Sequence, residues 1–240
     1  IIYNLIKVYN YFNKEIFMSG ISALINARLL STRLPRKLLL PFNGSTLIDI
    51  ALEKLDKMDF FENRYFAAAE EDLLKRADKY KNIQILKRDP LSVRPGYGDH
   101  KKIYEHYKLV KTKYLMWINP CHPLLSIETI KKAVIEFQKF NYNSYTSVIK
   151  TQDWIFNDEG YAVTNKSPKM LSTDHSPKYF KVAHAFHIIN KEYFLTNNQV
   201  WTLEKNDPYL LEIPEEESYD VNTKKEFEIA ESAYRTFLEN

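Results

Sequence analysis

Cationic and hydroxyl side chains gather in one short segment, residues 27–37, which reads Ala-Arg-Leu-Leu-Ser-Thr-Arg-Leu-Pro-Arg-Lys. Charge-assisted hydrogen bonds from Arg28, Arg33 and Lys37 would neutralise a polyanion such as a triphosphate. Ser31 and the loop amides would donate further hydrogen bonds to its oxygens. Composition alone leaves a second interpretation open, a basic loop that is simply solvated.

Two pairs of residues elsewhere could carry metal or acid–base chemistry. Cys121 and His122 are adjacent, so their side chains point in different directions, and no second pair with metal-site spacing occurs. A zinc site or a Cys–His nucleophile is therefore not predicted. His184 and His187 are three residues apart in an apolar run that we interpret as a strand, which predicts that they face opposite sides of a sheet.

The elements that must position these residues alternate between strand and helix along most of the chain. Short apolar runs indicate strands at 21–25, 65–68, 83–86, 114–118, 145–149, 183–189 and 209–213. Helical periodicity indicates helices at 46–58, 71–79, 101–110, 127–140 and 223–238, with a short helix starting near 191.

This order predicts the α/β class, with a doubly wound, mostly parallel sheet. In such sheets ligands bind outside the carboxyl ends of the strands, where the strand order reverses. The loops after the first, second and fourth strands are therefore the expected site, and segment 27–37 is the first of them.

A chain of 240 residues with 34 basic and 31 acidic side chains has the balance of a globular protein. The net charge of +3 is scattered, so the dense basic stripe of a nucleic-acid-binding protein is missing and no nucleic-acid partner is expected. The single cysteine excludes an intramolecular disulfide, and no secretory signal begins the chain, so a cytoplasmic location is expected.

The chain is expected to form one domain, residues 18–240, behind an N-terminal extension, residues 1–17, of unknown role. The extension is apolar, but Lys7, Lys14 and Glu15 interrupt it, and it is too short to span a bilayer, so no membrane partner is expected. Strand and helix patterns fail over residues 151–182, which predicts an excursion that carries substrate contacts or a dimer interface.

Segment 27–37 also resembles the signature of the CMP-sugar synthetases, the group that includes the acylneuraminate and Kdo cytidylyltransferases. The resemblance continues over residues 39–48, 118–125, 183–194 and 212–231, so that it covers about residues 21–234. It implies a Rossmann-like fold of the nucleotide-diphospho-sugar transferase type.

The activity that this resemblance implies is the transfer of CMP from CTP to an acidic sugar of the sialic-acid (nonulosonic acid) or Kdo type. A sugar oxygen would attack the α-phosphate, pyrophosphate would leave, and Mg²⁺ would bridge phosphate oxygens. Such enzymes serve surface polysaccharide biosynthesis and are commonly homodimers that use the excursion.

The resemblance also implies site residues. Those implied for catalysis are Arg28, Lys37 and Asp220. Those implied for nucleotide binding are Ala27, Arg28, Ser31, Arg33, Lys37, Ala68 and Asp99. Those implied for binding the sugar are Asn119, His122, Gln152 and His184, and those implied for Mg²⁺ are Asp220 and Asn222.

Several positions depart from the family pattern and leave alternatives open. The family's Asp-x-Asp is Asp220-Val221-Asn222 here, and Asn222 with Thr223 would equally well cap the last helix. Residues 67–70, Ala-Ala-Ala-Glu, replace a Ser-Thr-Asp that contacts the nucleotide in relatives, and Asp99 is an equally good helix cap. An inactive nucleotide- or sugar-binding relative, or a transferase for a different acceptor, is the alternative function.

Overall fold

The computed structural model describes residues 18–140, 142–164, 172–174 and 176–239, so the expected extension at 1–17 lies outside the described residues. Within these residues, seven strands form one sheet in the order β5-β4-β1-β6-β8-β7-β9. Their bounds are β1 Met18–Asn26, β4 Phe61–Ala68, β5 Gln84–Lys87, β6 Tyr114–Ile118, β7 Ser144–Thr151, β8 Tyr179–Asn190 and β9 Tyr209–Glu212. The small hairpin of β2 (Pro41–Phe42) and β3 (Ser45–Thr46) stands apart from this sheet.

Neighbouring strands are parallel except where β8 lies antiparallel between β6 and β7, which confirms the mostly parallel α/β class. From β1 the chain builds outward through β4 to β5 and then returns to the other side of β1 with β6. The strand order therefore reverses between β1 and β6, where a ligand cleft is expected.

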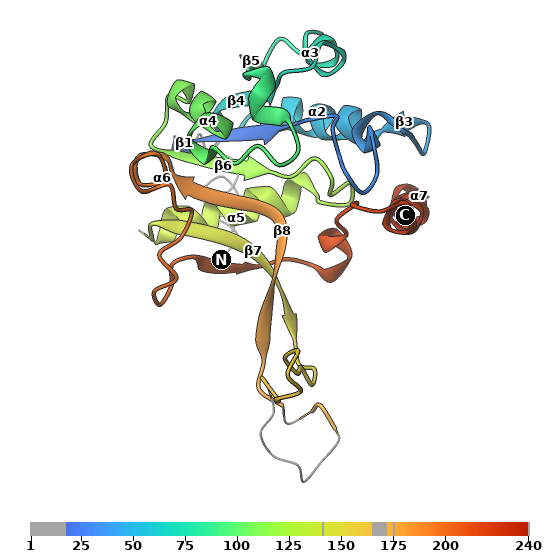
Figure 1. The fold of residues 1–240 in the computed structure, drawn as a ribbon, viewed down its shortest axis with the longest axis vertical. Helices are drawn as coiled ribbons and strands as arrows, with labels where there is room; N and C mark the ends of the chain where they lie inside the picture. Colours follow the sequence, from blue (N-terminus) through green and yellow to red (C-terminus); the bar gives the residue numbers. More distant parts are fainter. Residues whose placement is uncertain (1–17, 141, 165–171, 175, 240) are drawn as a thin grey trace, which may run out of the picture.

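The helices also follow the predicted order (Figure 1). They are α2 Leu47–Lys57, α3 Glu71–Ala77, α4 His100–Ile103, α5 Ile127–Lys139, α6 Lys191–Asn197 and α7 Lys224–Glu239. Short 3₁₀ segments lie at η1 Lys37–Leu39, η2 Pro90–Val93, η3 Glu105–Leu109 and η4 Glu215–Ser218. The single helix expected at 101–110 is wrong, because the segment divides at Tyr104 into one α-helical turn and the 3₁₀ helix η3.

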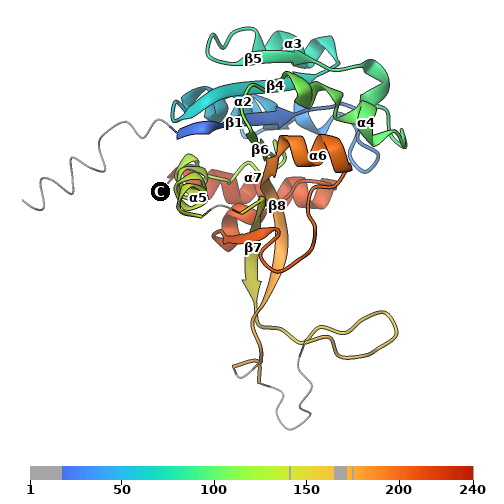
Figure 2. The ribbon, with the colours of Figure 1, turned by 90° about the vertical axis from the view of Figure 1, so that its left-hand side faces the viewer.

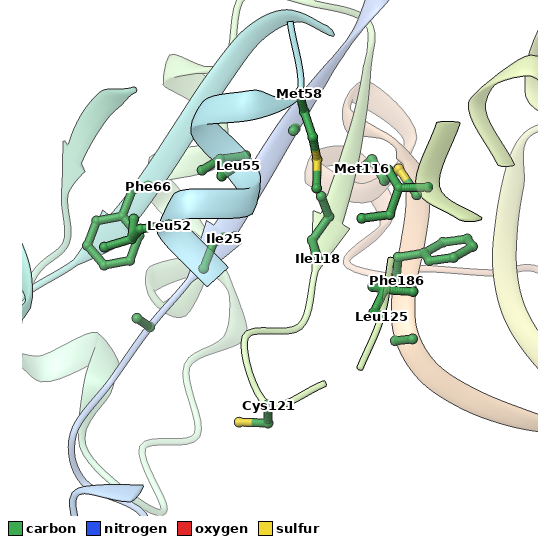
Figure 3. Close-up of a cluster of buried hydrophobic side chains, with 14 of the residues drawn as sticks. Ile25, Leu52, Leu55, Met58, Phe66, Met116, Ile118, Cys121, Leu125 and Phe186 are labelled. Carbon is green, nitrogen blue, oxygen red and sulfur yellow. The ribbon is translucent and has the colours of Figure 1, made fainter. Parts of the chain in front are cut away.

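Alternating side chains of the strands supply two cores, one on each face of the sheet. Ile25 of β1 and Phe66 of β4 pack with Leu52 and Leu55 of α2 on one face (Figure 3). On the opposite face, Leu24 and Tyr65 pack with Tyr107 and Phe194, which come from η3 and α6. The fold is therefore doubly wound, with helices on both faces of the sheet.

Strands β7 and β8 run beyond the sheet and form a hairpin arm that projects from the body in both views (Figures 1 and 2). The arm carries most of the excursion expected at residues 151–182, of which residues 165–171 and 175 lie outside the described residues. Over the part of the chain that is described, no helix combines the length and apolar character needed to cross a bilayer.

Candidate active site

A cleft of about 840 Å³ opens at the carboxyl ends of β1 and β6, where the strand order reverses. Asn26, Ala27 and Arg28 at the end of β1 form one wall, and Trp117 of β6 lies in the floor. Arg94, Gly96, Tyr97 and loop residues 199–203 contribute to the rim. A partly apolar cleft of this size suits a nucleotide together with a second small molecule.

Arg88 is the cationic side chain buried in the wall of this cleft, with only 7% of its surface exposed. Its guanidinium donates to the backbone oxygens of Ala27 (3.4 Å), Ser92 (3.3 Å) and Ile103 (3.4 Å), and its Nε has no hydrogen-bond partner among the described residues. Burial lowers the pKa of Arg88 from its ordinary value, with Arg28 nearby acting in the same direction. Arg88 thus ties the end of β1 to the loop after β5 and adds positive potential to the cleft.

The loop after β1 places Arg28 in the cleft with its side chain exposed, and Arg33 is exposed further along the same loop. The amide of Leu29 donates to the Glu70 carboxylate at 2.7 Å, which ties this loop to the segment after β4. Arg36 adopts a left-handed backbone with φ of 54°, a conformation that favours glycine.

The prediction that His184 and His187 face opposite sides of the sheet is wrong, because His184 Nδ1 lies 3.2 Å from His187 Nε2. The pairing of β7 with β8 shifts at this point, and His184 has φ of 56°, so the strand no longer alternates. The Ser147 hydroxyl holds the bulge, since it accepts from the amides of Ala185 (3.0 Å) and Phe186 (3.1 Å). Both histidines therefore line the cleft.

His187 is the buried member of the pair and stacks on Trp117 with ring centroids 5.3 Å apart. Its Nδ1 lies 2.8 Å from the Thr146 hydroxyl. Burial, with a smaller effect from His184, lowers the pKa of His187 to about 3. The ring is therefore neutral at physiological pH and presents a fixed hydrogen-bonding edge.

Two side chains of the loop after β6, Asn119 and His122, contact the backbone of this bulge. Asn119 donates from Nδ2 to the oxygen of His184 at 3.1 Å and accepts from the amide of Cys121 at 3.0 Å. His122 is 4% exposed and its Nε2 lies 3.0 Å from the oxygen of Ala183. Both side chains thus position the bulge and the loop, and neither lines the cleft.

Lys37, Asp220 and Asn222 form a second polar group close to His122. Lys37 donates from Nζ to the oxygen of Val221 and to Asn222 Oδ1 (3.0 Å), while Asn222 Nδ2 donates to Asp220 Oδ2 at 2.6 Å. Asp220 Oδ1 is buried, accepts no hydrogen bond from the part of the chain that the structure describes, and lies 3.9 Å from His122 Nδ1. The structure therefore brings together the three residues that the sequence predicts around Mg²⁺ and the phosphates.

Thr223 caps the last helix, and the side chain of Asn222 does not. Thr223 Oγ1 accepts from the Glu226 amide at 3.3 Å, and Glu226 accepts from the Thr223 amide at 2.7 Å, which is a capping box. The side chain of Asn222 is left to contact Lys37 and Asp220.

Other residues expected in the site lie outside the cleft. Ala68 is fully buried in β4, with its oxygen accepting from the Arg88 amide at 2.8 Å. Asp99 caps α4 by accepting from the Lys102 amide at 3.1 Å. Gln152 lies on the arm, where it donates to the oxygens of Asp174 and Ser176. Ser31 lies half-buried in the loop after β1, and its amide donates to the Leu29 oxygen at 2.9 Å.

Sequence reasoning missed Arg88, Glu70 and the tryptophans of the cleft, Trp117 and Trp201. Arg88 directly follows β5, so its place at the carboxyl end of a strand was a signal that could have found it. Trp201 lies in an irregular segment with no periodic pattern, and nothing local to it indicates a cleft residue.

A doubly wound sheet, a cleft at its switch point and a cationic loop after the first strand define an α/β nucleotidyltransferase. A sequence model of the cytidylyltransferase family matches residues 22–239, nearly the whole chain. The chain belongs to the cytidylyltransferase family, and it is an enzyme of the class that uses CTP.

Solved structures with the same fold include a CMP-2-keto-3-deoxy-manno-octonic acid synthetase complexed with CTP, at a TM-score of 0.66 and 12% identity over 91% of this chain and 100% of that chain. The 4-diphosphocytidyl-2C-methyl-D-erythritol synthase of Anaerococcus prevotii has a TM-score of 0.64 and 14% identity, covering 95% of this chain and 100% of that one. The bifunctional IspDF of Campylobacter jejuni has a TM-score of 0.59 and 14% identity, over 88% of this chain and 54% of that chain. At these identities the likeness concerns the fold. None of the curated proteins matches the chain significantly.

Proposed function

We propose that this enzyme transfers CMP from CTP to an acidic sugar of the nonulosonic acid or Kdo type and releases pyrophosphate. The observation that carries the proposal is the cleft itself, in which Arg28, Arg88 and Arg94 supply the charged lining and no carboxylate is present among the described lining residues. Such a cleft attracts a triphosphate and an acceptor carboxylate together. The likeness of the fold to a Kdo-type synthetase complexed with CTP is in keeping with it.

In the proposed complex the triphosphate lies along the loop after β1. Arg28 contacts the phosphates from the cleft, Arg33 and Ser31 support the loop, and Lys37 approaches from the side of Asp220. Lys37 exchanges its contact with Asn222 for a phosphate oxygen, because an ammonium prefers a formal negative charge to an amide oxygen.

The reaction joins an acceptor hydroxyl oxygen to the α-phosphorus and breaks the bond from that phosphorus to the oxygen bridging to the β-phosphate. The proton of the hydroxyl passes to the solvent, and pyrophosphate carries away the electron pair of the broken bond. The protein contributes alignment of the acceptor and neutralisation of charge on the phosphate oxygens. We place the acceptor beside His184 and Trp201, on the side of the cleft away from the phosphate loop.

The residues present fit a divalent cation at Asp220. This carboxylate has a buried Oδ1 without a hydrogen-bond partner, and Mg²⁺ typically takes one or two carboxylates with phosphate oxygens and water. Asn222 would add its amide oxygen after Lys37 has moved away. When bound, Mg²⁺ would withdraw charge from the phosphates during transfer.

The test is pyrophosphate release from CTP and Mg²⁺ with a panel of nonulosonic acids and Kdo. We expect release with one acidic sugar, and a drop of about a hundredfold in kcat/KM for Arg28→Ala because a charged contact to phosphate is lost. Lys150→Ala, which removes an exposed cation of the arm, is the matched control. No release with any acidic sugar, from a folded protein, would overturn the proposed acceptor.

A phosphorylated polyol is the second candidate acceptor. Its support is the fold shared with a synthase of 4-diphosphocytidyl-2C-methyl-D-erythritol, together with cleft cations that suit a phosphate as well as a carboxylate. The same panel, extended by methylerythritol phosphate, separates the two acceptors.

A further inference from the structure

Two hydrogen-bond acceptors face each other between the loop after β6 and the segment before α7. They are His122 Nδ1 and Asp220 Oδ1, 3.9 Å apart, both buried and both without a hydrogen-bond partner. His122 Nε2 contacts a backbone oxygen, that of Ala183, so the proton of the neutral ring is on Nε2. Nδ1 then carries a lone pair directed toward a carboxylate oxygen.

Two buried acceptors 3.9 Å apart, each without a donor among the described residues, are unfavourable unless something positive lies between them. The side chain of His122 is completely buried and that of Asp220 is 30% exposed, but Asp220 Oδ1 is itself buried, so a cation reaches the gap only when Asp220 rotates. No other described side chain donates to either atom.

We propose that His122 Nδ1 is a ligand, together with Asp220 Oδ1, of the divalent cation in this enzyme. The proposal rests on the cation site assigned to Asp220 in the proposed function. Ligand atoms about 2.1 Å from a metal are about 3 Å apart when adjacent in an octahedron and about 4 Å apart when opposite. The observed 3.9 Å needs only a small rotation of Asp220 to reach either arrangement.

His122 would add a cation ligand at a site where Asn222 stands in place of the second aspartate of the family pattern. Asn222 uses its Oδ1 to accept from Lys37 and its Nδ2 to donate to Asp220 Oδ2, so it supplies no charge to a cation. Among the described residues no group of three or more His, Cys, Asp or Glu side chains is arranged as a metal site. His122 and Asp220 are the ligands that this segment offers at once; the Asn222 amide oxygen joins them when Lys37 has moved away, and phosphate oxygens and water complete the shell.

The positively charged side chains near His122 and Asp220 decide when a cation can bind there. Lys37 and Arg33 lie on the phosphate loop near Asp220 and Cys121, and both repel a cation. His184 approaches His122 from β8. The triphosphate of CTP offsets these positive groups, so the cation binds together with the nucleotide.

A nitrogen ligand shifts the preference among metals. Mg²⁺ favours oxygen ligands, whereas Mn²⁺ accepts imidazole and carboxylate together. We therefore expect Mn²⁺ to bind more tightly than Mg²⁺ in the presence of CTP.

The test is electron paramagnetic resonance of Mn²⁺ bound to the full chain with CTP and no acceptor sugar. Spin-echo modulation detects a coordinated ¹⁴N, and protein grown with ¹⁵N-histidine assigns that signal to a histidine without any substitution. His122→Gln is the matched variant, because its Nε2 can still donate to the Ala183 oxygen while the Nδ1 ligand is lost. We expect the ¹⁴N coupling to vanish and the affinity for Mn²⁺ to fall at least tenfold.

His184→Gln, the nearest other histidine, should keep the coupling. Bound Mn²⁺ without histidine nitrogen coupling in the wild-type protein would overturn the proposal, and so would a His122→Gln protein that keeps the coupling. A water molecule or a proton would then lie between the two atoms. Because no acceptor is present, the result is independent of whether the proposed sugar is correct.

Discussion

At the scale of single residues, burial decides the protonation of the histidines around the cleft. His106 is 6% exposed and its Nε2 lies 2.8 Å from Asn26 Oδ1, at the end of β1. Burial, with Arg88 acting in the same direction, lowers the pKa of His106 to about 3, close to the value that burial sets for His187. Both rings are held neutral, so each can hold a neighbour in a defined hydrogen bond.

These two histidines predict acid-sensitive folding. Their pKa values are about 3 in the folded chain, below about 6.5 in an unfolded one, so unfolding takes up protons between these values. The free energy of unfolding is therefore fully present above pH 6.5 and is lost as the pH falls. Each of these two protons contributes about 1.4 kcal/mol per pH unit to the slope.

Urea denaturation between pH 6.5 and 4.5 measures this slope. His106→Gln keeps a donor toward Asn26 and removes one titrating group, so we expect the slope to fall by about 1.4 kcal/mol per pH unit. His100→Gln, at an exposed position of α4, should leave it unchanged. Equal slopes for wild type and His106→Gln would contradict the prediction.

At the scale of elements, the 3₁₀ helix η4 is joined to the N-terminus of α5 by a buried carboxylate. Glu217, 7% exposed, accepts from the Ser126 amide (2.9 Å), the Ser126 hydroxyl (2.8 Å) and the Thr129 hydroxyl (2.9 Å). A negative charge is favourable at the N-terminus of a helix. The Glu217 carboxylate also raises the pKa of Lys54, but the larger effect of burial lowers that pKa to about 8. Lys54 in turn donates to the backbone of the loop after β6.

Glu217→Ala should therefore destabilise the fold by about 2–4 kcal/mol, since one buried and two part-buried donors lose their acceptor. The measurement is the free energy of unfolding in urea at pH 7. Glu216→Ala, at the exposed neighbouring position, is expected to change it by less than about 0.5 kcal/mol. A loss no larger than that of the control would show that Glu217 does not hold α5 in place.

At the scale of the whole molecule, the arm of β7 and β8 projects from the body (Figure 2), and apolar side chains on it are exposed. Phe156 is 56% exposed and stacks on Trp154, and Tyr161 and Val163 are 70% and 51% exposed. Exposed aromatic and aliphatic groups on a projecting segment are typical of an interface between protein chains. The homodimer expected from the sequence would place a second copy on this arm.

Phe156→Asp should convert that dimer into monomers, because a charge would be buried at the centre of the interface. Light scattering coupled to size-exclusion chromatography gives the mass. Leu109→Asp, at a residue that is 60% exposed on the body, is the control and should remain dimeric. A monomeric wild-type protein would exclude the dimer, and a dimeric Phe156→Asp protein would exclude this interface.

The amino-acid sequence by itself determined the order of strands and helices, the α/β class and the position of the phosphate loop. These depend on local patterns: the period of apolar residues, the turn at Asn43-Gly44 and caps such as Thr46, whose hydroxyl accepts from Asp49. The prediction of a single helix over 101–110 was wrong because the division at Tyr104 depends on packing against α6, which no local pattern reveals.

Only the tertiary structure decided which of the candidate residues meet. The bulge at His184 turns His184 and His187 toward each other, because a left-handed backbone at a single residue breaks the alternation on which the prediction depended. His122 and Asp220 face each other because the loop after β6 and the segment before α7 end at the same edge of the sheet. Such contacts depend on strand order and loop path, and spacing along the chain does not encode either.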